Sequence, residues 1–96
     1  MNKYEIMFIV RAAEESTNIK KTADTYKSLI TDLKGKVVEF KELGQKKLAY
    51  PIKKELNGYY YVMQVEASVD CIHEFDRKIG LDENVLRHLI IRQEEE

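Results

Sequence analysis

The chain has 96 residues, of which 44% are hydrophobic and 34% charged, and its formal net charge is −1. This length holds one domain with a single modest core, and the balance of apolar and charged residues excludes a disordered or fibrous chain. No apolar run reaches the roughly 20 residues that cross a bilayer, and no signal peptide is recognisable. A single cysteine excludes an internal disulfide. We therefore expect a cytoplasmic protein.

The first two predicted elements are a strand and a helix. Residues 3–10 are rich in β-branched and aromatic side chains, and the apolar run at their end is typical of a central strand covered on both faces. Residues 16–18 (Ser-Thr-Asn) are suitable N-caps, and Gly35 is expected to end the helix in a left-handed conformation. Between them, apolar residues at alternating steps of four and three predict the helix: Ile19, Ala23, Tyr26, Ile30 and Leu33.

An edge strand follows. Residues 36–43 alternate loosely between apolar and polar side chains, and the strand continues over residues 48–50 after a bulge or bend at Gly44. Pro51 cannot donate a hydrogen bond to a β-ladder, which places this segment at an edge of the sheet.

A hairpin and a second helix come next. The pair Asn57-Gly58 is a strong turn signal, so we expect the hairpin to close there, before an aromatic strand over residues 59–65. Ser68 is expected to cap the second helix. Its core-facing residues are predicted to be Ile72, Phe75 and Ile79.

The end of the chain supplies the last strand. Gly80 is expected to end the second helix, with Leu81 making the apolar contact of a Schellman-type cap. Residues 85–92 predict the final strand, and the acidic residues 94–96 are expected to be disordered.

The order β-α-β-β-α-β predicts an α+β fold of the ferredoxin-like class, as a single domain over residues 1–93. In this arrangement two helices cover one face of a four-stranded antiparallel sheet. Right-handed crossovers place the first and third strands side by side at the centre.

The face of the sheet that the helices leave open is predicted to be apolar. On the last strand, odd residues from Val85 and even residues from Leu86 compete for the core, and either choice leaves large apolar groups outside. Scattered exposed apolar residues are ordinary, but a contiguous patch indicates a protein partner. The residues expected there are Met7, Ile9, Tyr60, Val62, Leu89 and Ile91.

The segment 44–54 has a short apolar run bracketed by two lysine pairs. From residue 34 to residue 55 there are seven lysines and three glutamates, so positive charge is concentrated here although the whole chain is nearly neutral. Such lysines can contact nucleic-acid phosphates, or can simply keep an edge strand from pairing with another chain.

Catalytic and metal chemistry find little support. His73 and His88 lack further ligands at metal-binding spacing, and Cys71 is expected to be a small buried hydrophobe without a base beside it. The sequence contains no glycine-rich phosphate loop and no nucleophile elbow, so we expect neither an enzyme nor a cofactor. Residues 58–62 (Gly-Tyr-Tyr-Tyr-Val) echo an RNA-recognition motif, but Tyr60 and Gln64 depart from its pattern, which argues against base stacking on the sheet.

Four motifs together resemble one family. They are Tyr4-Glu5, Gly44-x-Lys46-Lys47-Leu48-Ala49-Tyr50-Pro51-Ile52-x-Lys54, Gly58-Tyr59-Tyr60 and Asn84-Val85-x-Arg87. They resemble the bacterial small-subunit ribosomal protein S6 family over nearly the whole chain. The resemblance implies a ribosome-bound protein without catalysis. It also implies binding to the central domain of small-subunit ribosomal RNA, paired with ribosomal protein S18.

The resemblance also implies contact residues. Lys46 and Lys47 match the basic pair of the family, Arg87 matches its basic residue on the last strand, and Lys3 stands where the family begins with basic residues, although Asn2 departs from that pattern. With Lys54 of the segment 44–54 and Arg92 of the last strand, the predicted phosphate contacts are Lys3, Lys46, Lys47, Lys54, Arg87 and Arg92. We expect Leu48 and Tyr50 to join the open-face residues at the interface with the partner protein.

Two other classes of function remain open at this point. A self-dimerising or small-molecule-sensing domain of the same fold would use the same open face. Acyl-phosphate hydrolysis also occurs on this fold, but its arginine-bearing glycine loop is missing here.

Overall fold

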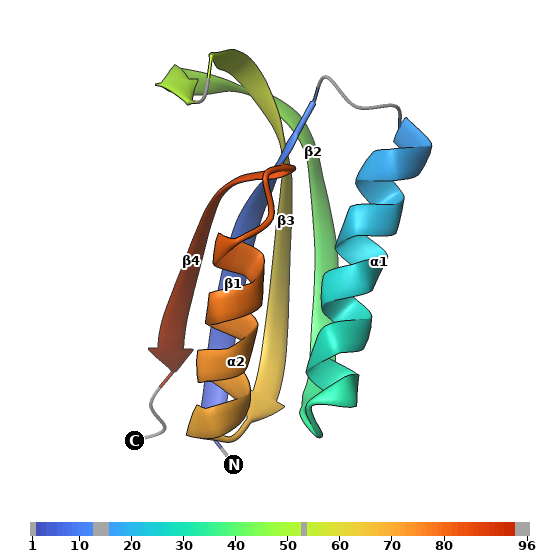
Figure 1. Ribbon diagram of the computed structural model, residues 1–96, viewed down its shortest axis with the longest axis vertical. Coiled ribbons are helices and arrows are strands. Elements are labelled where there is room, and N and C mark those ends of the chain that lie inside the picture. The colour runs from blue at the N-terminus through green and yellow to red at the C-terminus, as the bar shows by residue number, and fades with distance from the viewer. Residues whose placement is uncertain (1, 13–15, 53, 94–96) are drawn as a thin grey trace.

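The computed structural model describes residues 2–12, 16–52 and 54–93. The elements are β1 (Asn2–Arg11), α1 (Ser16–Asp32), β2 (Lys36–Ile52), β3 (Glu55–Ala67), α2 (Val69–Gly80) and β4 (Val85–Gln93). The strands form one antiparallel sheet in the order β2-β3-β1-β4, and both helices pack on the same face of it (Figure 1). The ferredoxin-like fold and the central position of the first and third strands are confirmed. The predicted tail, residues 94–96, lies outside the described residues.

The main core lies between the sheet and the helices. Strand residues two apart share a face, so β1 presents one alternating set of apolar side chains to the helices and β3 presents another. The rings of Phe8 and Tyr61 stack at 5.4 Å between centroids, and Tyr26 of α1 meets Phe8 edge-on at 5.8 Å. Neither helix, over the part of the chain that the structure describes, is long and apolar enough to cross a membrane.

Helix α1 ends in a way that the sequence did not predict. The left-handed residue is Lys34, with φ of 69°, and not Gly35. The N–H of Lys34 donates to the carbonyl of Thr31 at 3.0 Å, and that of Gly35 donates to the carbonyl of Ile30 at 2.8 Å. Position 35 is a glycine because a Cβ atom at this position would lie 2.9 Å from Cγ2 of Ile30. The residue is therefore needed for close packing and not for a positive φ.

The caps of α2 confirm one prediction and correct another. The Oγ of Ser68 accepts a hydrogen bond from the N–H of Cys71 at 3.1 Å, as expected of an N-cap. At the other end Leu81 has right-handed dihedral angles, and its side chain is 71% exposed. The predicted apolar contact of Leu81 is therefore wrong, because that contact belongs to a left-handed cap that does not form here.

A bulge at the start of β4 resolves the competition between odd and even residues. The pairing with β1 shifts register between Ile9 and Val10, which places Val85 in the main core and Leu86 on the opposite face. From Arg87 onward, odd residues share the open face with Ile9.

The hairpin between β2 and β3 is longer than predicted. Lys46 pairs with Gly58 and Lys47 pairs with Asn57, so both residues of the expected turn lie within β3. The hairpin closes after the Ile52–Glu55 pair, where Lys54 has φ of 66°. The predicted bulge at Gly44 is confirmed, because its φ is 87° and the register shifts there.

Candidate nucleic-acid and protein interface

The end of the hairpin forms an arm, defined here as residues 45–52 and 54–57, that bends over the upper end of the sheet toward β4 (Figure 1). Because side chains alternate along a strand, Lys46, Leu48, Tyr50 and Ile52 share the face of the arm that turns toward the sheet. The segment that the sequence singled out is therefore folded back onto the open face.

Leu48 anchors this arm. Its side chain is only 6% exposed and packs in a small second core with Ile9 and Leu86, bordered by Ile52 and Tyr60. Ile9 does face away from the helices as predicted, but the arm covers it and leaves it 4% exposed. Ile9 and Leu48 are therefore buried within the chain, and their predicted accessibility to a partner is wrong.

Tyr50 joins the arm to the opposite edge of the sheet. The Nη1 of Arg87 on β4 donates a hydrogen bond to the Tyr50 hydroxyl at 2.6 Å, and its guanidinium carbon lies 5.4 Å from the centroid of that ring. On the other side of Leu48, the Nζ of Lys46 lies 5.7 Å from the centroid of the Tyr60 ring. Two of the predicted phosphate contacts are thus held over tyrosine rings.

The structure separates the predicted cations into two groups. Lys46, Lys47, Lys54 and Arg87 lie at the arm end, although strand alternation turns Lys47 to the face opposite Lys46. Lys3 and Arg92 lie at the other end of the sheet, where β1 starts and β4 ends (Figure 1). Ile9 lies six positions after Lys3 along β1, or about 20 Å away at the rise of an extended strand.

Below the arm, the open face keeps an exposed apolar surface. Met7 pairs with Leu89 on one side and with Val62 on the other, and Ile91 lies two residues farther along β4. Leu89 and Ile91 are 48% and 47% exposed, and Met7 and Val62 are half-buried. These four residues form what we call the open-face patch, which is contiguous across three strands as predicted.

Comparison with known proteins identifies the family. The model of the family described as ribosomal protein S6 matches residues 3–92. The chain belongs to the ribosomal protein S6 family. A crystal structure of 30S ribosomal protein S6 from Thermotoga maritima superposes with a TM-score of 0.91 at 25% sequence identity, over 96% of this chain and 87% of that one. S6 proteins are RNA-binding structural components of the small ribosomal subunit that serve translation, and the family is not one of enzymes.

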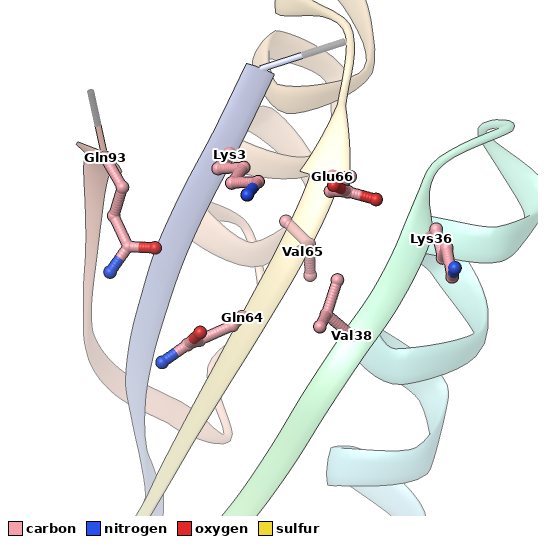
Figure 2. Close-up of a pocket in the computed structure, with 7 residues that line it drawn as sticks. All are labelled: Lys3, Lys36, Val38, Gln64, Val65, Glu66 and Gln93. Carbon is pink, nitrogen blue, oxygen red and sulfur yellow. The ribbon is translucent and has the colours of Figure 1, made fainter. Parts of the chain in front are cut away.

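The sequence did not predict a pocket at the end of the open face far from the arm. The pocket has a volume of about 270 Å³, and Figure 2 shows side chains from all four strands around it. Val38 lines it because the register shifts between Val37 and Glu39. In the sequence, the adjacent valines Val37 and Val38 interrupt the alternation of the strand, and this interruption could have indicated the bulge. The other lining residues are Lys3, Lys36, Gln64, Val65, Glu66 and Gln93.

The groups with perturbed pKa values lie on the helix side of the sheet. Burial, followed by the hydrogen bond and charge of Asp82, raises the pKa of Tyr26, whose hydroxyl donates to that carboxylate. Burial, followed by the charge of Glu42, raises the pKa of Tyr61 to about 12. Burial also raises the pKa of the Cys71 thiol, which is opposite to what a reactive cysteine needs. None of these shifts activates a group on the open face.

The two histidines are structural or exposed. His88 on β4 places its Nε2 2.6 Å from Oδ1 of Asp76, which links the strand to α2, and His73 is exposed. Within residues 2–12, 16–52 and 54–93, no three of His, Cys, Asp and Glu gather in a way that could hold a metal ion.

Proposed function

We propose that this S6-family protein binds the central domain of small-subunit ribosomal RNA as a heterodimer with ribosomal protein S18, and so supports subunit assembly and translation. One arrangement supports the proposal: Lys46 and Arg87 lie on the same face of the sheet as the open-face patch. A partner that covers the patch brings its own RNA contacts beside these cations. The RNA-binding surfaces of the two proteins, each modest alone, then bind the same RNA together.

The protein side of this interface is the open-face patch with Tyr50 and Tyr60 at its border. Contiguous apolar side chains that remain half-exposed are typical of a surface that another protein covers. Ile9 and Leu48 serve this interface from beneath, because they fix the arm that borders it.

The RNA side is the arm end. Lys46, Lys47, Lys54 and Arg87 would contact phosphates, which position a protein on RNA without reading its sequence. Lys3 and Arg92 would make a separate contact at the far end of the sheet, with Arg92 oriented by the hydrogen bond from its Nη2 to Oδ1 of Asn2 at 3.1 Å.

Binding measurements with the purified pair test the proposal. Fluorescence anisotropy with a labelled central-domain RNA fragment should show weak binding by either protein alone and binding at least a hundredfold tighter by the pair. The logarithm of the pair's association constant should fall linearly with the logarithm of salt concentration, by about 0.7 to 0.9 for each phosphate contacted. A pair that binds no more tightly than its better member contradicts the proposal.

Sedimentation of a cell lysate separates this function from self-dimerisation on the same patch. We expect the protein to migrate with the small ribosomal subunit in the cytoplasmic fraction. Migration as a free dimer would instead support an interaction domain that pairs with itself.

A further inference from the structure

We infer that Tyr50 is a positioning residue for Arg87, which it holds in a phosphate-binding orientation before the RNA arrives. The inference rests on the proposed function, in which Arg87 contacts a phosphate. It assigns Tyr50 a different role from the partner contact that its exposure alone suggests, and it makes the arm a preformed part of the RNA-binding surface.

The geometry of the Tyr50–Arg87 pair is the first observation that supports the inference. A hydrogen bond from Nη1 to the Tyr50 hydroxyl and a ring face 5.4 Å from the guanidinium carbon act together on one side chain. The hydrogen bond uses one of the five N–H donors of the guanidinium. The other donors retain the planar arrangement that binds phosphate oxygens. Among the described residues, no carboxylate forms an ion pair with Arg87.

The anchoring of the arm by apolar contacts is the second observation that supports the inference. Leu48, two residues before Tyr50, belongs to the small core with Leu86, and Ile52, two residues after Tyr50, packs against that core. Leu86 directly precedes Arg87 in β4. The same apolar contacts therefore fix both the strand that carries the tyrosine and the strand that carries the arginine, without any contribution from RNA.

The consequence for binding is entropic. A long arginine side chain loses rotamer freedom when a phosphate immobilises it, and a side chain that is already held loses less. Removing the tyrosine should thus weaken RNA binding even though it carries no charge. We expect the loss to be about three- to tenfold, in line with a cation–π contact and one hydrogen bond at an exposed site.

A double-mutant cycle in the complex with S18 tests the inference. The variants are Tyr50→Leu, Arg87→Ala and the two combined, with the central-domain fragment as ligand. Arg87→Ala should lower the affinity and reduce the salt dependence by about one phosphate contact. Tyr50→Leu should lower the affinity in the wild-type background and have no further effect when Arg87 is already alanine.

Other variants keep the test sharp. Tyr50→Phe retains the ring and loses the hydroxyl, so its affinity should lie between wild type and Tyr50→Leu, and it replaces the leucine variant in the cycle if that one folds poorly. Leu81→Ala changes an exposed apolar residue outside the arm and should leave RNA affinity unchanged in both backgrounds.

The outcomes distinguish a failure of the inference about Tyr50 from a failure of the proposed function. If the losses from Tyr50→Leu and Arg87→Ala add, or if Tyr50→Leu weakens S18 binding without RNA by the same factor, Tyr50 acts on its own and the inference is overturned while the proposed function stands. If Tyr50→Leu binds like wild type, the inference is also overturned. If Arg87→Ala changes neither affinity nor salt dependence, the phosphate contact of the proposed function fails, and the inference fails with it.

Discussion

A Cβ atom on Gly58 would lie 2.2 Å from Cγ2 of Ile9, far closer than two non-bonded carbon atoms approach each other. Gly58 is a regular residue of β3, paired with Lys46 on one side and Arg11 on the other. Its missing side chain makes room for Ile9, on which Leu48 packs. The seat of the arm therefore depends on a glycine in the strand beneath it.

Gly58→Ala should destabilise the fold and loosen the arm. The added methyl group displaces Ile9, and overpacking of this kind costs about 1 to 3 kcal/mol of the free energy of unfolding. Equilibrium denaturation in urea measures the loss. Gly80→Ala is the control, because its Cβ would meet only Cε1 of His88 at 3.7 Å and alanine favours the last turn of a helix. Equal stability of the two variants would contradict the packing argument.

The sequence predicted the order of the elements because that order depends on local periodicity. The stripe of α1, the alternation in β3 and the Ser68 cap each involve neighbouring residues, and all three form as expected. The position of the hairpin turn was wrong because Asn57-Gly58 has a strong local preference for turns. A long-range contact with Ile9 uses the same glycine for another purpose.

The candidate site was predictable only in part for the same reason. Composition and alternation placed an apolar surface on the open face, and the open-face patch is found there. The burial of Leu48 and the contact between Tyr50 and Arg87 join residues far apart in the chain. They depend on the bend of the arm, which no spacing in a single sequence encodes.

Lys34→Gly should stabilise the protein. Lys34 is held at φ of 69°, a conformation that costs a residue with a side chain about 1 kcal/mol more than it costs glycine. We expect the midpoint of urea denaturation to rise by the corresponding amount with an unchanged slope. Gly35→Ala is the matched variant at the next position, and it should destabilise because its methyl group meets Ile30. The opposite order of stabilities would show that the helix end is not built as described.

Stability should fall in alkaline solution, in part through Tyr61. Its pKa is about 12 in the folded state against the ordinary value of 10.0 for tyrosine, so between these two pH values the unfolded state binds fewer protons than the folded one. The contribution of Tyr61 is thus complete below pH 10 and is lost as pH rises toward 12. Denaturation curves measured from pH 8 to pH 12 should show this decline.

Tyr61→Phe isolates that contribution. The hydroxyl is buried without a hydrogen-bond partner in the described part of the chain, so its removal should leave stability at pH 7 unchanged or slightly higher. The alkaline decline should become shallower and should retain the part due to Tyr26, whose pKa is also raised. An identical decline in wild type and Tyr61→Phe would rule out the assignment.

Leu89→Glu should separate partner binding from folding. Leu89 is about half-exposed and lies in the open-face patch on the edge strand β4, so a glutamate there stays solvated in the free protein and should change the free energy of unfolding by less than about 0.5 kcal/mol. In the proposed heterodimer with S18 the same carboxylate would be buried without a partner, which should weaken binding of S18 at least tenfold. Leu81→Glu is the control, because Leu81 is more exposed and follows α2, outside the patch. Isothermal titration of S18 into each variant makes the comparison, and equal affinities would place the partner on another surface.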